Sequence, residues 1–444
     1  MSIQSVERFE LLPSNQPANN TYSFKQGTPL VTFNIGSVSK FLKASSVRIN
    51  GQIEFFDSAN ARPNNSGLKT GATSTIEMNP RVGVNSIFQN VNLASNDSNQ
   101  TLESVRQYGR MFASVVPSVM SEEDFLSHMG VVTKSTAQQT SGDAQMNNKM
   151  AFSCRIFSGM MQSGVALPLG VNGTRGLQIS LELASDQQVL FGAQAAAAGG
   201  GYYQVSNLSL SGEMLVPDPA TQQKMSVASS GAIVFNTIQN LYSVINASDA
   251  TQTYNLASDS VLSVFHNFLP ITHSNNYSQD GFATDMLKNT DAAGTDYDTD
   301  VILKKVSFSR GGMKLGLDYE LDSEVQSTQG LPPTGVVVNA LNSLQPYPSL
   351  TKMVNQPQLY PFGTKDVSVS GSAIQEFGTV DSKKNFAIGL AMDRVSEQGI
   401  SFKGTSYSLR VQSTADGKSP MSVFTYYLAK NVLQYSPSGI MVSS

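Results

Sequence analysis

The clearest strand pattern in the chain is Leu177-Gln178-Ile179-Ser180-Leu181-Glu182-Leu183, in which apolar and polar residues alternate without a fault. Successive side chains of a β-strand point to opposite faces, so this period of two predicts a strand with one buried face. The same period recurs over 47–55, 313–321 and 386–392, and clusters of Gly, Pro, Asn and Ser separate these runs. Such clusters are typical of turns, and the chain is therefore predicted to be all-β.

A partial copy of this strand lies near the C-terminus: residues 407–413 read Tyr-Ser-Leu-Arg-Val-Gln-Ser, against Ile-Ser-Leu-Glu-Leu-Ala-Ser at 179–185. Each copy is followed, after a Gly-containing loop, by a Tyr-Tyr pair and an Asn five positions beyond its first tyrosine: Tyr202, Tyr203 and Asn207, then Tyr426, Tyr427 and Asn431. From Leu181 to Leu409 is 228 residues and from Tyr202 to Tyr426 is 224, about half of the 444-residue chain. The shared order and nearly equal offset predict an internal duplication.

Proline punctuates the point between the two copies, in Val216-Pro217-Asp218-Pro219-Ala220. We therefore predict a first domain over 1–216, a linker over 217–229 and a second domain over 230–444. An eight-stranded jelly roll is two facing sheets around one core, and two such units of about 200 residues each fit the length. The predicted fold is all-β, with two tandem eight-stranded jelly rolls and a few short helices in loops.

Helical spacing occurs in only a few places. Leu102, Val105, Tyr108 and Phe112 recur at intervals of three and four residues, which predicts one helix there. A second short helix is predicted from the capping-box pattern at 121–124, with Gly130 as its end. Long polar stretches without periodicity are predicted to be loops at the ends of the sandwiches: 59–67, 133–149, 192–201 and 273–300.

Charged residues make up only 14% of the chain, and Ser, Thr, Asn, Gln and Gly take their place. Two interpretations stay open: a neutral all-β surface, or broad and weakly charged contacts between subunits. The formal net charge is −4, and no run of Lys and Arg is longer than a pair. Binding to phosphate backbones normally needs a basic patch, so direct sequence-specific nucleic-acid binding is not expected.

The chain has one cysteine, Cys154, which excludes an intramolecular disulfide and a cysteine-based metal site within one chain. The first residues lack the basic-then-apolar pattern of a signal peptide, and no stretch approaches the ~18 apolar residues of a membrane helix. We expect a soluble protein that is made in the cytosol. Because Cys154 lies in the apolar stretch 152–157, we expect a buried and inert thiol.

No catalytic, cofactor-binding or metal-binding residue is predicted, and no cofactor is expected. The three histidines, His128, His266 and His273, lack a metal-binding spacing and are expected to be satisfied or surface residues. A phosphate-binding loop and a Gly-x-Ser-x-Gly elbow are also missing from the sequence. Catalytic groups that assemble only in space would leave no such trace.

The alternating acids Asp296, Asp298 and Asp300 imitate the start of a calcium loop. Val301 and Ser307, however, stand where such a loop needs glycine and glutamate. We expect a solvated loop, and weak calcium binding at a subunit contact stays open as the alternative.

Two regions resemble the major capsid proteins of Polinton-like viruses and their virophage relatives. One is formed by 79–89 and 99–110, and resembles their first jelly roll. The other runs from 399–402 through Tyr426 and Tyr427 to 438–442, and resembles the closing strands of their second jelly roll. The resemblance implies a virion capsid protein without catalytic activity, synthesised in the host cytosol. It carries no functional residue over, because the family has no catalytic motif.

The same resemblance implies a homotrimer that presents six sandwiches as a pseudo-hexagonal capsomer of an icosahedral shell. Neighbouring capsomers and minor and vertex capsid proteins are the implied partners, and an underlying membrane stays open. Tower loops are expected to be absent or reduced, because the chain is shorter than many virophage homologues.

Two alternatives remain at this point. A minor or vertex capsid protein usually needs only one jelly roll, which the repeat at half-length argues against. A carbohydrate-binding β-sandwich protein belongs to a different class. The absence of Trp argues against it, although 15 Tyr are present.

Overall fold

The structure is a computed structural model of the chain. It describes residues 3–60, 66–68, 76–78, 82–96, 99–114, 149–162, 164, 166–170, 174–192, 196, 199–227, 231–278, 281–282, 303–320, 364–369, 372–377, 387–392, 399–413, 420–436 and 439–443. Within these ranges, no helix has the length and apolar character needed to cross a membrane.

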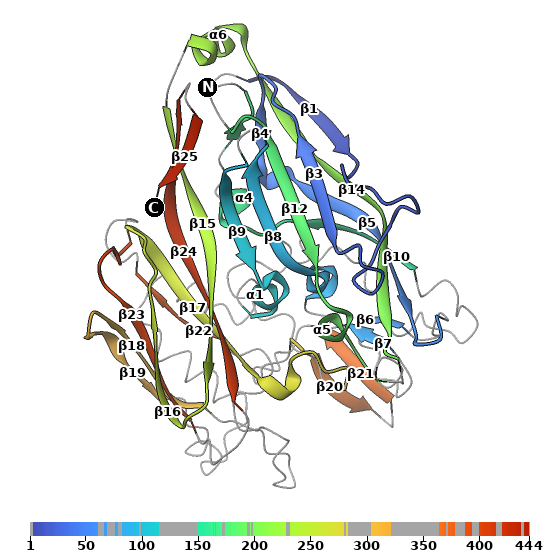
Figure 1. Ribbon diagram of the computed structural model, residues 1–444, viewed down its shortest axis with the longest axis vertical. Helices are drawn as coiled ribbons and strands as arrows, with labels where there is room; N and C mark the ends of the chain where they lie inside the picture. Colours follow the sequence, from blue (N-terminus) through green and yellow to red (C-terminus); the bar gives the residue numbers. More distant parts are fainter. Residues whose placement is uncertain are drawn as a thin grey trace.

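The first half of the chain forms two large sheets and one small one (Figure 1). Sheet A has the order β10-β5-β14-β4-β11, with β1 and β2 also paired to β14: β1 (Ile3–Leu11), β2 (Thr21–Tyr22), β4 (Phe41–Lys43), β5 (Arg48–Phe56), β10 (Lys149–Arg155), β11 (Ala166–Pro168) and β14 (Tyr202–Pro217). Sheet B has the order β3-β12-β8-β9: β3 (Leu30–Ile35), β8 (Phe88–Ser95), β9 (Thr101–Arg106) and β12 (Leu177–Leu183). Sheet C joins β6 (Ser66–Leu68), β7 (Ile76–Met78) and β13 (Leu190–Phe191).

The second half repeats the two large sheets. Sheet D has the order β15-β24-β17-β22, with β25 also on β24: β15 (Gly231–Ile245), β17 (Val261–Pro270), β22 (Ala387–Ala391), β24 (Met421–Ser436) and β25 (Gly439–Ser443). Sheet E has the order β16-β23-β18-β19: β16 (Asp249–Tyr254), β18 (Leu303–Arg310), β19 (Met313–Glu320) and β23 (Tyr407–Ser413). A separate hairpin joins β20 (Thr364–Val369) and β21 (Ser372–Phe377).

The strand order of the two halves is the same. In sheet B, β12 lies between β3 and β8, with β9 at the edge; in sheet E, β23 lies between β16 and β18, with β19 at the edge. The two copies of the sequence repeat, 179–185 and 407–413, therefore fall on equivalent strands. The Tyr-Tyr pairs also fall on equivalent strands, β14 and β24. Because every strand pairing of the described residues stays within one half, each half forms its own sandwich.

The alternating sequence pattern is reproduced in the burial of the strands. Along β12 the four apolar residues are buried, and the polar residues between them are half-buried or exposed. The runs at 47–55, 313–321 and 386–392 fall on β5, β19 and β22, which confirms the strand predictions. Burial does not alternate at the start of β19, because Met313 is 74% exposed. In the second sandwich, the His266 ring of β17 stacks on Phe308 of β18 and Tyr407 of β23, so that sheets D and E pack face to face.

Short helices connect the strands: η1 (Ala44–Ser46), η2 (Gly83–Ile87), α1 (Tyr108–Ser114), α4 (Gly159–Gln162), α5 (Asp186–Val189), α6 (Pro219–Val227) and η4 (Ile271–His273). The helix α6 lies inside the predicted linker. Its first turn is capped by Asp218, whose Oδ1 accepts the Thr221 N–H at 2.6 Å, and Pro219 stands where no backbone donor is needed. The domain limits 1–216, 217–229 and 230–444 themselves stay a prediction.

One helix prediction is wrong at its beginning. Leu102 and Val105 belong to β9, which pairs with β8, and only Tyr108 and Phe112 lie in the helix α1. Leu102 and Val105 are both buried although they are three residues apart, because β9 contains a bulge. A bulged strand can therefore show the same three-residue spacing of buried residues as a helix. The predicted helix at 121–130 and the predicted loop at 133–148 lie outside the described residues, as does 283–300 of another predicted loop. In the predicted loop 59–67, Ser66 and Gly67 instead belong to β6.

Candidate functional site at the joint between the two sandwiches

The two sandwiches meet where the edge strand of sheet B faces the edge strand of sheet D. These strands are β9 and β15, which lie side by side (Figure 1). Within the described strands they form no ladder, because β9 pairs only with β8 and β15 pairs only with β24. The edge of a strand has backbone N–H and C=O groups without partners in its own sheet. Where β9 and β15 face each other, such groups are buried, so they need hydrogen-bond partners outside a strand ladder.

Glu103 of β9 supplies these partners. Its Oε1 accepts hydrogen bonds from the backbone N–H groups of Gly159 (2.8 Å) and Ile238 (2.6 Å), and its Oε2 accepts one from Met160 (2.9 Å). Gly159 and Met160 begin α4 in the first sandwich, whereas Ile238 lies on β15 in the second. One carboxyl group therefore holds three main-chain donors from two sandwiches.

The Glu103 side chain lies next to a β-bulge in β9. Leu93 of β8 pairs with Glu103 and Ala94 pairs with Thr101, so Leu102 is one extra residue on β9. Bulges break the alternation of a strand and can re-aim a side chain. Leu102 and Glu103 are consecutive and both 3% exposed, which a regular half-buried strand would not allow.

Burial sets the acidity of Glu103. Removal from water raises the pKa of the Glu103 carboxyl above its usual value, and the hydrogen bonds from Ile238, Met160, Ser158 and Gly159 oppose that rise. The carboxyl group has no ion-pair partner in the described part of the chain. These hydrogen bonds, three from the main chain and one from the Ser158 side chain, therefore compensate its burial.

Gly159 allows α4 to approach β15 closely. A Cβ atom at this position would lie 2.6 Å from the carbonyl oxygen of Asn236 and 2.7 Å from Cα of Thr237, both on β15. These distances are far below van der Waals contact. The missing side chain is therefore what brings the Gly159 and Ile238 amides to the same oxygen of Glu103.

The helix α1 makes a second contact across the joint. Arg110 is 3% exposed, and its Nη1 donates a hydrogen bond to the Gly281 carbonyl at 2.5 Å. Its guanidinium group lies 4.8 Å from the ring centre of Phe424 on β24 and 5.8 Å from that of Phe282. Cation–π contacts of a desolvated arginine reach about 2 kcal/mol, so Arg110 stabilises the same joint.

The face of sheet D that points away from sheet E also contributes to the joint. Phe424 and Tyr426 alternate with core residues of β24, and the Tyr426 hydroxyl donates to the Gln107 carbonyl at 2.9 Å, just before α1. Every residue of β17 is buried, because one face packs on sheet E and the other lies toward α1. The joint is thus a closed contact with an apolar centre.

The chain after η4 adds a third contact. The Tyr277 hydroxyl donates to the Gly201 carbonyl at 2.8 Å, and the Tyr277 carbonyl accepts the Gly192 N–H at 2.9 Å. Nearby, the Ser185 hydroxyl donates to Asn275 Oδ1 at 3.2 Å. Residues of the second half therefore bind the segments of the first sandwich that flank α5 and β13.

The face of sheet A that points away from its core carries a network of polar side chains. Asn50 Nδ2 donates to the Ser211 hydroxyl at 2.9 Å, and Asn50 Oδ1 accepts from the Ser153 hydroxyl at 2.7 Å. Arg48 Nε also donates to the Ser153 hydroxyl, at 2.8 Å. These side chains therefore satisfy one another by hydrogen bonds across three strands. Glu54 and Arg155 lie on the same face by the register of β5 and β10, so the face carries charges as well.

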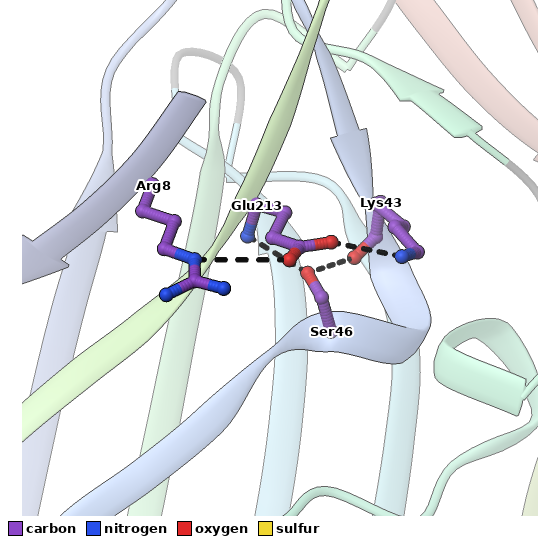
Figure 2. A network of polar contacts seen from close by, with 4 residues as sticks. All are labelled: Arg8, Lys43, Ser46 and Glu213. Carbon is purple, nitrogen blue, oxygen red and sulfur yellow. Dashed lines mark hydrogen bonds and ion pairs between the residues drawn. The ribbon is translucent and has the colours of Figure 1, made fainter. Parts of the chain in front are cut away.

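Ion pairs fasten the edge strand β1 at one end of this face (Figure 2). Glu213 of β14 pairs with Lys43 at 2.8 Å and with Arg8 of β1 at 4.0 Å. The Glu213 N–H donates to the Ser46 hydroxyl, which in turn donates to the Lys43 carbonyl. Edge strands often carry such charges, because charges hinder pairing with foreign strands.

The histidines were predicted to be satisfied or surface residues, and His266 is satisfied in the core. Its Nδ1 lies 2.9 Å from the Thr425 hydroxyl and its Nε2 2.7 Å from the Tyr407 hydroxyl. Burial lowers the pKa of His266 to about 3, so the ring is neutral. His273 is buried as well, but its Nδ1 has no hydrogen-bond partner among the described residues, so it is neither a surface histidine nor a fully satisfied one. His128 lies outside the described residues.

Cys154 is fully buried, as the sequence predicted, and burial raises the pKa of its thiol to about 12. No group of three or more His, Cys, Asp or Glu side chains that could hold a metal ion occurs among the described residues. Asp296, Asp298 and Asp300 lie outside them, so the calcium alternative stays a prediction. The sequence analysis did not single out Glu103, Arg110 or Gly159 as functional, and no local pattern marks them.

The comparisons with known proteins concern the fold. No protein-family model matches the sequence, and a search of curated proteins finds no match. Among solved structures, the chain is similar to VP54 of PBCV-1 fitted into a reconstruction of the virophage Sputnik, with 12% identity, a TM-score of 0.56, and coverage of 100% of this chain and 98% of that chain.

Two further structures are similar over nearly the whole chain. The Faustovirus major capsid protein has 9% identity and a TM-score of 0.55, with 97% of this chain and 90% of that chain covered. The mavirus major capsid protein has 9% identity and a TM-score of 0.50, with 98% and 90% covered. These similarities show that the chain has the double jelly-roll fold, as predicted from the half-length repeat.

Proposed function

We propose that the chain is a major capsid protein, a structural subunit without catalytic activity that acts in the virion. The observation that carries the proposal is the similarity in fold to solved viral capsid proteins over nearly the full length of both chains. The joint supports it, because Glu103, Arg110 and Tyr426 couple two sandwiches into one building block.

The subunit assembles as a homotrimer in this proposal. Three chains present six sandwiches of nearly equal shape, which form a pseudo-hexagonal capsomer and tile an icosahedral shell. Neighbouring capsomers, minor capsid proteins and vertex proteins are its partners, and the protein is synthesised in the host cytosol. The low charge content of the chain suits repeated contacts between copies, in which many modest contacts add up.

The experiment that tests the proposal is mass measurement of the purified chain by light scattering, followed by negative-stain imaging. We expect a species with three times the 47.6 kDa of one chain, and hexagonal tiles or closed particles at higher concentration. A monomer that persists at high concentration and binds glycans reproducibly on an array contradicts the proposal. That result favours the carbohydrate-binding alternative.

A further inference from the structure

We propose that Glu103 is a positioning residue that sets the orientation of the second sandwich relative to the first. It does so in place of main-chain pairing between the facing edges of β9 and β15. The consequence for shell assembly rests on the proposed function, whereas the positioning itself concerns the isolated chain and is tested on it.

The main-chain donors around Glu103 determine this role. The Ile238 N–H points from the open edge of β15 and has Glu103 Oε1 as its acceptor at 2.6 Å. On the other side, the Gly159 and Met160 N–H groups begin α4 and lie 2.8 and 2.9 Å from the two oxygens. Since these groups are buried, each one loses its bond to water and gains one to Glu103.

The geometry leaves little freedom for the second sandwich. Hydrogen bonds weaken steeply with length and angle, and three of them converge on one carboxyl group. Gly159 lies against Asn236 and Thr237 without any side chain between them, so β15 cannot move toward α4. Movement away from α4 would stretch the bond between Ile238 and Glu103.

Glutamine at this position tests the role, because it keeps the shape of glutamate and changes its charge and its hydrogen-bonding capacity. The amide has one acceptor oxygen and one NH₂ donor group. In either orientation, the NH₂ group faces at least one of the three backbone N–H groups. Glu103→Gln therefore creates a buried contact between two donors at the joint and leaves the apolar cores unchanged.

The matched control is Glu182→Gln. Glu182 lies on β12 of the same sheet, is exposed, and accepts one hydrogen bond from Asn90 Nδ2. The two variants have the same change in net charge and in side-chain volume. Only Glu103 touches both sandwiches.

The first measurement is the distance between spin labels on cysteines introduced at Asn34 of sheet B and Thr251 of sheet E. Both positions are exposed, and the native Cys154 is buried, so it stays unlabelled. We expect one narrow distance distribution in the parent chain and in Glu182→Gln, and a broadened or shifted one in Glu103→Gln. A narrow and unshifted distribution in Glu103→Gln overturns the proposal.

The second measurement is hydrogen exchange at the Gly159, Met160 and Ile238 amides. We expect exchange at these amides to be about tenfold to a hundredfold faster in Glu103→Gln, the range that corresponds to loss of hydrogen bonds to a charged group. Amides of β12 should keep their protection. Rapid exchange of the Ile238 amide in the parent chain would show that its hydrogen bond to Glu103 is not formed, and would overturn the proposal. This measurement needs no variant, so it tests the proposal even if Glu103→Gln does not fold.

Particle assembly separates this proposal from the proposed function. If the parent chain forms no trimers or particles but Glu103→Gln still loosens the joint, the positioning role stands and the capsid proposal fails. If Glu103→Gln keeps the parent distance distribution and assembles normally, the positioning role fails and the capsid proposal stands.

Discussion

At the scale of single residues, His266 shows how the core of the second sandwich treats a titratable group. The ring is fully buried, packed against Phe308 and Tyr407, and bonded at both nitrogens to hydroxyl groups. The His266 imidazole therefore packs in the core in its neutral form. It makes the free energy of unfolding depend on pH.

We expect the parent chain to lose stability below about pH 6.5, where an unfolded histidine takes up a proton. Folded His266 resists protonation down to a pKa of about 3. The unfolded state therefore binds more protons between these two values, and acid favours unfolding. The measurement is urea unfolding of the parent chain and of His266→Gln at pH 7.5 and pH 5.0.

The stability advantage of the parent chain over His266→Gln should shrink by about 2 kcal/mol at the lower pH. Asp186 acts with the opposite sign, because burial raises its pKa to about 6, and it is present in both proteins. The difference between the two proteins therefore isolates His266. An equal pH dependence in both would contradict the neutral core histidine.

Cys154 provides a second prediction at this scale. Its thiol is buried, and its pKa of about 12 keeps it protonated at neutral pH, whereas thiolates are the reactive form. We expect a thiol reagent to leave the native chain unlabelled and to label it completely in denaturant. Labelling of the native chain as fast as in denaturant would show that this part of sheet A is open to solvent.

At the scale of elements, the approach of α4 to β15 depends on a missing side chain. Adding a methyl group at Gly159 pushes against the main chain of β15 at 2.6–2.7 Å. Main-chain atoms cannot turn aside as a flexible side chain can. The two elements must therefore move apart, which lengthens the hydrogen bonds to Glu103.

We expect Gly159→Ala to lower the free energy of unfolding by about 1–3 kcal/mol, the usual cost of overpacking. The matched control is Gly36→Ala, because a Cβ atom at Gly36 meets nothing within 4 Å. Urea unfolding of both variants measures the effect. Equal stability of the two would show that α4 and β15 have room between them.

At the scale of the whole molecule, the low charge content bears on assembly. Charged residues are only 14% of the chain, and Ser, Thr, Asn, Gln and Gly take their place. Contacts between surfaces of this composition depend little on long-range attraction between charges. Salt screens attraction of that kind, but it leaves apolar and hydrogen-bonded contacts largely unchanged.

We expect the oligomer of the purified chain to persist in about 1 M NaCl, where the Debye length is only ~3 Å. Light scattering across a salt series measures this directly. Dissociation at high salt would mean that ion pairs, rather than polar and apolar contacts, hold the copies together.

Most of the architecture could be read from local sequence. The alternation at 177–183 and its partial copy at 407–413 predicted equivalent strands in two halves, and the structure places them at equivalent positions in sheets B and E. Alternation depends only on neighbouring residues, because a strand turns every second side chain to the same face. The strand period and the duplication were therefore accessible before any contact was known.

The joint could only be decided by tertiary structure. Leu102 and Val105 suit a helix or a bulged strand, and pairing with β8 selects the strand. Glu103 and Ile238 are 135 residues apart, and no spacing along the chain connects them. The burial of a carboxyl group, and the glycine that lets a helix reach a strand edge, follow from how two finished sandwiches pack. Local periodicity says nothing about that packing, because it describes one element at a time.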